Sequence, residues 1–287
     1  ASLTDEERMV QDSVARFVDD AVLPIIRPHF ENHTFPRELV GELAALGLLG
    51  SSLEGYGCAG MNAVSYGLIC QELERGDSGL RSFCSVQGSL VMWPINEYGS
   101  EEQKREYLPK LASGEMIGSF GLTEPDFGSN PGGMLTTARK EGDEYVLNGR
   151  KCFITNANHA GVFIVTAVTD RSLGSKGISA FVVPRDIEGF SLEPGETKLG
   201  MRGSDWASLV FQDARIPRSH LLGPAGEGFS TFMKTLEGGR ISIAAAGANV
   251  WATIARPTIG LGTDGQFLEM QRSTTSGTAW ALLATPA

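Results

Sequence analysis

The spacing of the apolar residues changes near Gly114, and this change constrains the fold more than any other feature. Before Gly114 they recur every three or four positions, the period of a helix with one buried face. After it, short apolar runs are separated by Gly, Pro, Asp and Ser, as is typical of strands and turns. From about Gly228 the helical period returns. This order predicts an α+β protein, with a helical domain at residues 1–114, a β-barrel-like domain of antiparallel strands at 115–225 and the start of a second helical domain at 226–246.

Start and stop signals divide the first domain into helices. Two Ser/Thr-x-x-Glu/Gln capping boxes, at residues 4–7 and 100–103, each open a helix. We expect the first of these helices to stop at Pro24, whereas Pro36 suits the first position of a second helix. Further helices are predicted over residues 62–75 and 77–98.

The dipeptide Asn148-Gly149 lies between the apolar runs 144–147 and 151–155. Asn-Gly between two such runs favours a two-residue hairpin turn, so we expect a β-hairpin here. The other predicted strands are 162–168, 178–183, 190–193 and 208–212.

The charge balance argues against nucleic-acid binding. With 34 acidic and 24 basic residues the net charge is −10, which repels phosphate backbones and anionic membrane surfaces, and no run of Lys and Arg offsets it. No apolar run approaches the roughly 18 residues of a membrane span. The first dozen residues show neither a signal-peptide core nor a transit-peptide pattern. The expected location is the bacterial cytoplasm or the mitochondrial matrix.

Cysteine and histidine spacing does not indicate a metal site. The four cysteines contain no CxxC pair, which favours reduced, structural thiols. His29 and His33 have i, i+4 spacing, but Pro28 and Pro36 bracket them and there is no HExxH motif, so no metal ligands are assigned.

Two GxGxxG matches are interpreted as decoys. The dinucleotide-binding motif requires a strand before it and a helix after it. Residues 55–60 lie between predicted helices, and residues 260–265 follow Pro257 without a βαβ pattern.

The segment 116–133 begins as an apolar strand and breaks at Glu124-Pro125 into a loop. Gly128, Ser129 and Thr123 in and beside this loop are residue types that bring backbone N–H groups and hydroxyls close to a polar ligand. The same composition is also typical of an ordinary surface turn, and the segment by itself leaves both interpretations open.

The sequence resembles the acyl-CoA dehydrogenases, and within that family the glutaryl-CoA dehydrogenase branch. Matching motifs include Gln-Glu-Leu-Glu-Arg at 71–75, Leu-Thr-Glu-Pro at 122–125, Asn-Gly-Arg-Lys at 148–151 and Phe-Ile-Thr-Asn at 153–156. Further matches lie at 81–87, 98–103, 107–111, 198–204 and 238–241, so the resemblance runs in order over roughly residues 3–246. It implies a helical N-terminal domain, a β middle domain and a C-terminal four-helix bundle.

The resemblance also implies FAD as the cofactor. Leu122 and Thr123 would hydrogen-bond the edge of the flavin ring, and Thr155 would lie near its reactive nitrogen. Phe153 replaces a common Trp, and Asn130 replaces a common Asp. The implied cofactor contacts are Phe120, Gly121, Leu122, Thr123, Gly128, Ser129, Phe153, Ile154 and Thr155.

For the substrate, the resemblance implies a carboxylate-binding pair. Arg81 and Ser85 are four residues apart and share one side of a helix, and Glu74 would orient the arginine. Without the family match, a surface Arg81 in a solvated ion pair with Glu74 or Asp77 explains the same residues. The implied substrate contacts are Glu74, Arg81, Ser82, Ser85, Ser129, Glu237 and Arg240.

The implied reaction is α,β-dehydrogenation of an acyl-CoA thioester. A glutamate removes the α proton while hydride leaves the β carbon for the flavin, and in the glutaryl branch CO2 is then lost. Electron-transfer flavoprotein is the implied acceptor, and a homotetramer the implied assembly. A straight-chain dehydrogenase remains an alternative to the glutaryl reading.

The resemblance ends near Ala246. Residues 247–287 lack the pattern of an amphipathic bundle, and their one glutamate, Glu269, is not in a context that resembles the family's Tyr-Glu-Gly motif. We therefore assign no catalytic base, and we interpret 247–287 as a divergent tail on a truncated or replaced C-terminal domain. An inactive flavin- or acyl-CoA-binding remnant is the alternative to an active enzyme.

Overall fold

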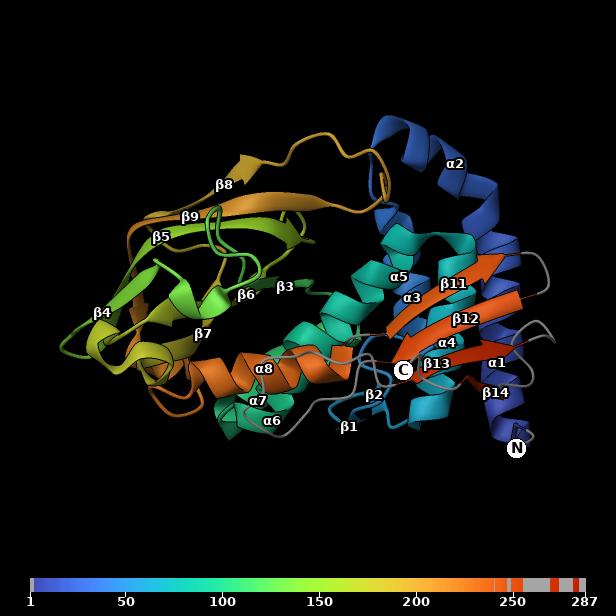
Figure 1. Cartoon of the computed structure of the whole chain (residues 1–287), viewed down its shortest axis with the longest axis horizontal. Coiled ribbons are helices and arrows are strands. Elements are labelled where there is room, and N and C mark those ends of the chain that lie inside the picture. The colour runs from blue at the N-terminus through green and yellow to red at the C-terminus, as the bar shows by residue number, and fades with distance from the viewer. Residues whose placement is uncertain (1–2, 240, 247–248, 255–268, 274–280, 284–287) are drawn as a thin grey trace.

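The computed structural model places the first seven helices on one side of the molecule and a large β-sheet on the other (Figure 1). It describes residues 3–239, 241–246, 249–254, 269–273 and 281–283, with side chains described up to residue 236. Helices come first and strands follow, so the predicted α+β fold class is confirmed.

The helical part begins with two predicted features that the structure confirms. Thr4 Oγ accepts a hydrogen bond from the Glu7 N–H at 3.2 Å while the Glu7 carboxylate accepts one from the Thr4 N–H at 2.8 Å. Ser100 and Gln103 form the same reciprocal capping box. The helices are α1 (Asp5–Phe17), α2 (Leu23–Asn32), α3 (Val40–Ala45), α4 (Ala63–Gly76), α5 (Ser78–Ser85), α6 (Trp93–Tyr98) and α7 (Glu101–Ala112).

Pro24 does not end the first helix, contrary to the prediction. A π-helical turn, Val18–Val22, follows α1 directly, and the Leu23 N–H donates to the Val18 carbonyl five residues back. Because α2 begins directly after this turn, at Leu23, Pro24 lies in the first turn of α2. Its missing N–H breaks no internal hydrogen bond there. Pro94 follows a second π turn, Val86–Met92, in the same way.

The strands form one eight-stranded sheet in the order β10-β7-β6-β4-β5-β9-β8, with β3 also paired to β6. Most pairs are antiparallel, as predicted, but β3 and β4 run parallel to β6. Parallel strands cannot be joined by a tight turn. Here β4 and β5 lie between β3 and β6 in the chain, and β5 lies between β4 and β6, so both parallel pairs have a long connection. The strands are β3 (Gly118–Gly121), β4 (Thr137–Glu141), β5 (Glu144–Thr155), β6 (Val162–Val168), β7 (Ile178–Pro184), β8 (Phe190–Pro194), β9 (Trp206–Pro217) and β10 (Leu221–Leu222).

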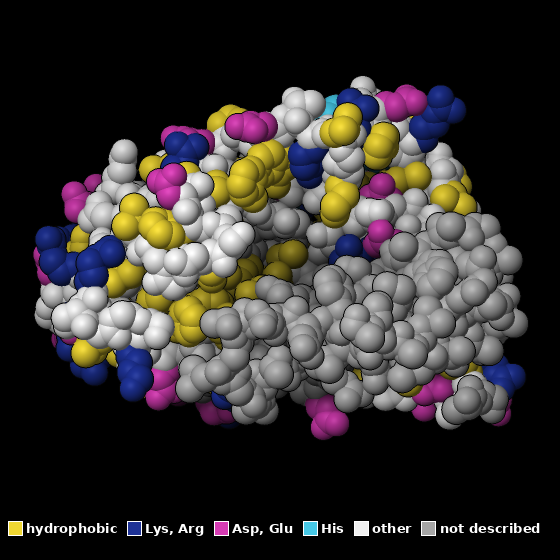
Figure 2. Space-filling model, in the orientation of Figure 1, with side chains coloured by type: hydrophobic (Ala, Val, Ile, Leu, Met, Phe, Trp, Pro, Cys, Tyr) yellow, Lys and Arg dark blue, Asp and Glu magenta, His cyan; other side chains and the backbone are white. Residues whose placement is uncertain are grey.

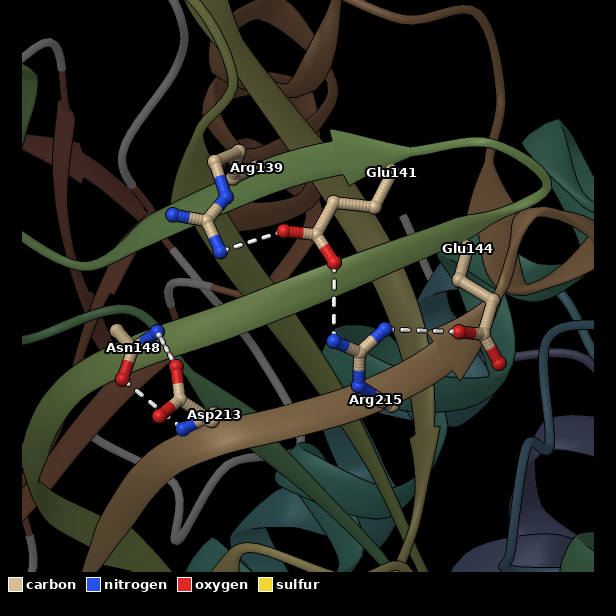
Figure 3. Close-up of polar contacts among 6 residues, drawn as sticks. All are labelled: Arg139, Glu141, Glu144, Asn148, Asp213 and Arg215. Atoms are coloured by element: carbon tan, nitrogen blue, oxygen red, sulfur yellow. Dashed lines mark hydrogen bonds and ion pairs between the residues drawn. The ribbon is translucent and has the colours of Figure 1, made fainter.

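Asn148-Gly149 lies inside β5, opposite a bulge in β9, so the predicted hairpin turn at this position is wrong. The register between β5 and β9 shifts between Leu147 and Gly149. Asn148 Nδ2 donates to the Asp213 carboxylate and the Asp213 N–H donates back to Asn148 Oδ1, both at 2.9 Å (Figure 3). The hairpin turn lies instead at residues 142–143, between β4 and β5. Asn148-Gly149 therefore continues the strand instead of forming a turn, because Asn148 is bonded to Asp213 on β9.

Ion pairs tie the adjacent ends of β4, β5 and β9 together. Arg215 donates to Glu141 at 2.9 Å and to Glu144 at 3.0 Å, and Arg139 donates to Glu141 at 2.6 Å (Figure 3). These side chains are largely exposed, so each pair adds little stability alone, but together they link three strands.

One hydrophobic core extends across the helical part and the sheet. It contains Val91, Ile95 and Leu111 from the helical side with Phe120 and Ile164 from the sheet. The fully buried side chain of Gln87 crosses the same boundary. Its Nε2 donates to the carbonyls of Leu111 (2.9 Å) and Met116 (3.0 Å), and its Oε1 accepts from the Gly118 N–H at 2.8 Å.

After the sheet, α8 (Gly228–Gly239) confirms the return to a helix, but the helix does not continue to residue 246. Residues Ile241–Ala246 form strand β11. Gly238 and Gly239 weaken the helix, and Ile241 and Ile243 are β-branched, which together favour a strand. β11 pairs antiparallel with β12 (Asn249–Ile254), followed by β13 (Glu269–Ser273) and β14 (Ala281–Leu283). Among the described residues no helix has the length and apolar character to cross a membrane.

We expect Gly149→Ala to lower the free energy of unfolding by about 2–4 kcal/mol. A Cβ at this position would lie 2.5 Å from the Thr136 hydroxyl oxygen and 2.7 Å from its Cα, and the φ of 147° favours glycine. Urea unfolding measures the change.

The matched control is Gly67→Ala in α4, where a Cβ meets no atom within 4 Å. It should leave stability unchanged or raise it by up to about 1 kcal/mol. A Gly149→Ala variant as stable as the parent would show that the close approach of β5 to Thr136 does not need glycine.

Candidate functional site

The two segments predicted to contact the cofactor lie side by side. The Cys152 N–H donates to the Thr123 carbonyl at 2.9 Å, and Lys151 Nζ donates to the Leu122 carbonyl at 3.1 Å. The end of β3 is thereby fastened to the second half of β5. Residues 120–123 and 153–155, which are about 30 positions apart in the sequence, are thus brought close together in the fold.

A buried ion pair beneath this junction was not predicted from the sequence. Lys151 Nζ lies 2.8 Å from Glu124 Oε1, with side-chain exposures of 0% and 4%. Glu124 also accepts hydrogen bonds from the N–H groups of Leu135 (2.6 Å) and Thr136 (3.0 Å). The available signal was a lysine directly before the run Cys-Phe-Ile in a predicted strand, because a buried lysine requires a partner.

Burial and charge act in opposite directions on this pair. Burial alone would raise the pKa of Glu124, but the Lys151 ammonium group and the hydrogen bonds outweigh it, so the pKa is lowered from 4.5. Burial lowers the pKa of Lys151 to about 8, against the opposing effect of the Glu124 carboxylate. Both groups are therefore mainly charged at neutral pH.

Phe153 presents its ring to solvent from a second irregularity in β5. The register shifts between Lys151 and Ile154, and Phe153 has a φ of 59°, unusual for a residue with a side chain. Its ring is 61% exposed and stacks on Trp206 with centroids 5.1 Å apart and an interplanar angle of 23°. This geometry leaves an aromatic surface available for another ring.

A cavity of about 430 Å³ adjoins this surface, lined by Phe153, Thr155, Leu199, Met201 and Trp206 among others. On the face shown in Figure 2, hydrophobic side chains gather around a hollow between the sheet side and the helical side of the molecule. The lining combines aromatic and apolar side chains with polar ones, among them Thr155, Lys198 and Ser204, and this mixture fits a planar heteroaromatic ring system with polar edges.

The other predicted cofactor contacts differ in exposure. Ile154 is 2% exposed and lies in the core of the sheet, so its side chain does not share the face of Phe153. Phe120, Gly121 and Leu122 are buried, Thr123 is half-buried, and Gly128 and Ser129 are exposed in the following loop. The structure therefore divides the predicted residues into a buried strand and an exposed loop.

The predicted substrate residues Glu74, Arg81 and Ser85 meet between α4 and α5. Arg81 Nε donates to Glu74 Oε2 at 2.7 Å, and Arg81 Nη1 donates to Ser85 Oγ at 3.4 Å. Ser78 donates to the second Glu74 oxygen at 2.7 Å. The Arg81 and Glu74 side chains are 21% and 23% exposed, so this ion pair is not fully solvated as the alternative interpretation required.

Tyr66 joins this cluster and was not predicted. Its hydroxyl lies 3.1 Å from Ser89 Oγ and 3.5 Å from Ser85 Oγ, and burial raises its pKa to about 12. Ser82 is half-buried on α5. Tyr66 lies in α4 one turn before Cys70, and its sequence context gave no signal of a polar role.

Two further predicted residues, Glu237 and Arg240, cannot be placed at this site. Glu237 belongs to α8 but lies beyond the described side chains, and Arg240 lies outside the described residues. Glu269 begins β13.

The other motifs make separate contacts. Residues 55–60 form a small hairpin of β1 (Glu54–Gly55) and β2 (Cys58–Ala59), and residues 260–265 lie outside the described residues.

His29 forms hydrogen bonds with Thr34 and Glu38, whereas His33 forms one with Arg202. In the described part of the chain no three His, Cys, Asp or Glu side chains cluster as metal ligands. Cys152 is buried, which raises its pKa, as expected of a structural thiol.

Comparisons with known proteins agree with both halves of the fold. The model of the acyl-CoA dehydrogenase N-terminal domain matches residues 4–115, and that of the acyl-CoA dehydrogenase middle domain matches 119–214. A short-chain specific acyl-CoA dehydrogenase of Clostridium acetobutylicum is 44% identical over 85% of this chain and 65% of its own length. The human mitochondrial short-chain specific enzyme is 41% identical over 88% of this chain and 61% of its own.

Among solved structures, a glutaryl-CoA dehydrogenase of Mycobacterium smegmatis in complex with FADH2 is 51% identical, with a TM-score of 0.79. The match covers 83% of this chain and 60% of that one. The chain thus spans less than two-thirds of the length of these relatives.

We expect Lys151→Met to lower the free energy of unfolding by about 3–5 kcal/mol, because it leaves the Glu124 carboxylate buried without its cation. Lys140→Met, at an exposed lysine of β4, is the control and should change stability by less than about 0.5 kcal/mol. Chemical denaturation of both variants at pH 7 provides the measurement, and equal effects would contradict a role for the ion pair.

The same variant should reverse the sign of the pH dependence. In the parent chain the folded pKa of Glu124 lies below 4.5, so its stabilisation is present above pH 4.5 and is lost as the pH falls through the folded value. Without Lys151 burial dominates, and the folded pKa rises above the unfolded one. Lowering the pH from 7 to about 5 should then restore part of the lost stability. Parallel pH profiles for parent and variant would count against this account.

Proposed function

Because the chain belongs to the acyl-CoA dehydrogenase family, of which it contains the N-terminal and middle domains, we propose that it takes part in the α,β-dehydrogenation of an acyl-CoA thioester. Members of this family are FAD flavoproteins, and FAD when bound accepts the hydride that leaves the substrate. The proposal rests on the convergence of residues 120–123 and 153–155 beside an aromatic-lined cavity.

We assign the following tasks to this chain's own residues. Phe153, supported by Trp206, stacks on the flavin ring, and the Thr155 hydroxyl hydrogen-bonds it. Leu122 and Thr123 bind the ring edge, while Gly128 and Ser129 in the exposed loop approach the phosphates. Since the carbonyls of Leu122 and Thr123 already accept from Lys151 and Cys152, their N–H groups and the Thr123 hydroxyl are the atoms left for the cofactor.

For the acyl group we propose a dicarboxylyl thioester such as glutaryl-CoA. The single observation that carries this choice is Arg81, a half-buried cation held by Glu74 with Ser85 beside it. Glu74 contacts Nε and Ser85 contacts Nη1, which leaves Nη2 and the second N–H of Nη1 for a carboxylate, and Ser85 and Tyr66 add hydroxyls. A straight alkyl chain would offer this cluster no partner, although relatives named as short-chain specific share much of the sequence.

No residue of the chain is assigned as the base that removes the α proton. If no base is available to the bound substrate, the chain is instead a flavin- or acyl-CoA-binding protein without dehydrogenase activity. Electron-transfer flavoprotein as acceptor, a homo-oligomeric assembly and a cytoplasmic or mitochondrial-matrix location remain predictions from the family.

Arg81→Ala should weaken binding of glutaryl-CoA by about 10- to 100-fold, because it removes charged hydrogen bonds to the distal carboxylate. Binding of butyryl-CoA should be nearly unchanged. Isothermal titration calorimetry on the purified chain measures both affinities.

Arg75→Ala is the matched control, since Arg75 also pairs with acids, Glu72 and Asp19, but belongs to a different cluster. It should affect both thioesters alike. A parallel loss for glutaryl-CoA and butyryl-CoA in Arg81→Ala would reject carboxylate recognition.

An anaerobic titration of the flavin-loaded chain with glutaryl-CoA separates the two candidate functions. Bleaching of the visible flavin bands requires a base and supports the dehydrogenase. Bound flavin that stays coloured supports the binding protein. A colourless chain that binds neither FAD nor thioester contradicts both.

A further inference from the structure

A second cleft, of about 400 Å³, lies between the helical part and the sheet and shares no residue with the contacts assigned above. Its lining comes from Arg37 before α3, Lys110 in the last turn of α7, the link 115–117, the turn 158–161 between β5 and β6, and Arg185 after β7. Side chains from both halves of the molecule therefore converge on one cavity.

The cleft is positively charged although the whole chain carries a net charge of −10. Arg37, Lys110 and Arg185 line it, against one carboxylate, Glu115. Within the part of the chain that the structure describes, none of these three cations forms an ion pair, whereas Arg75 and Arg215 each pair with two acids. Three cations without carboxylate partners in one cavity favour an anionic ligand.

Arg185 is held in a fixed orientation. Its Nη1 donates to the carbonyls of Ala157 (3.1 Å), Asn158 (3.1 Å) and Ala160 (3.0 Å). These bonds fasten one end of the guanidinium to the turn, and Nε and Nη2 have no hydrogen-bond partner among the described residues. A pre-organised guanidinium with free donors binds an oxyanion at low entropic cost.

His159 lines the same cleft as these cations. Its ring packs against Phe35, with centroids 5.3 Å apart. Burial lowers its pKa, and the charges of Arg37 and Arg185 lower it further, against the opposing effect of Asp205. Both arginines thus act on the same imidazole, which is neutral at pH 7 and can hydrogen-bond a ligand.

We propose that this cleft binds a phosphate group, either as free phosphate or as a small phosphomonoester. Three cations and a neutral imidazole suit a doubly charged oxyanion, and arginine matches the paired oxygens of phosphate. The volume exceeds that of phosphate alone, which leaves room for a small organic group. Because the lining comes from both halves of the molecule, the bound anion bridges the helical part and the sheet.

Titration calorimetry with inorganic phosphate, glycerol 3-phosphate and glycerol, at constant ionic strength, tests the proposal. The two phosphates should bind saturably and glycerol should not. Tighter binding of glycerol 3-phosphate identifies the phosphomonoester as the ligand, and equal binding identifies the phosphate group alone. In Arg37→Ala/Lys110→Ala, affinity should fall by at least about tenfold, because charged hydrogen bonds are removed.

Two further variants test whether phosphate binds in this cleft or responds only to the overall charge of the protein. Arg171→Ala/Lys176→Ala removes the same charge at exposed positions outside the cleft and should leave phosphate binding unchanged. Glu115→Gln removes the one carboxylate and should tighten binding by about two- to fivefold. Absence of saturable phosphate binding, or an equal loss in both double variants, would overturn the proposal.

Discussion

The buried ion pair of Lys151 and Glu124 is the interaction on which the candidate site depends. Two charges with exposures of 0% and 4% carry a large desolvation cost, which their mutual attraction and further hydrogen bonds to both groups offset. The ammonium group reaches Glu124 and the Leu122 carbonyl, and the carboxylate reaches the N–H groups of Leu135 and Thr136. Three stretches of backbone, at 122–124, 135–136 and 151, are therefore held around one pair of opposite charges.

The position of the pair explains the irregular backbone around it. β5 must direct Lys151 inward and Phe153 outward, and the register shift between Lys151 and Ile154 allows this. Phe153 adopts a positive φ, a strained conformation that the fixed neighbours on either side maintain. A regular strand would place residues 151 and 153 on the same face.

Local signals predicted the fold where the structure is decided locally. Both capping boxes form, because donor and acceptor are three residues apart and need no other part of the chain. Pro24 and Asn148-Gly149 were misinterpreted because their own residue types do not reveal the backbone around them. A π turn directly before Pro24 accommodates the proline. Asp213 of β9, 65 residues away, holds Asn148 within a continuous strand.

The residues of the candidate site divide in the same way, into those that local sequence signals reveal and those that depend on other parts of the fold. Arg81, Ser85 and Glu74 were predicted from helical spacing and family resemblance, and the structure brings them together. Tyr66 and Trp206 were missed because they support other residues from a neighbouring element, and the inward orientation of Ile154 depends on the bulge. The net charge of −10 also concealed a cationic cleft, since composition averages over a surface that the fold divides.

Gln87 has a consequence for how such proteins can evolve. The two family models meet at residues 115–119, which suggests two exchangeable modules. Yet Gln87 on the helical side bonds the backbone just before that junction, at Leu111, and within it, at Met116 and Gly118. Recombination at the junction would join a glutamine to a backbone that had not been selected with it. The boundary between the two family models is therefore not a mechanical boundary in the structure, because one buried side chain holds the backbone before and within it.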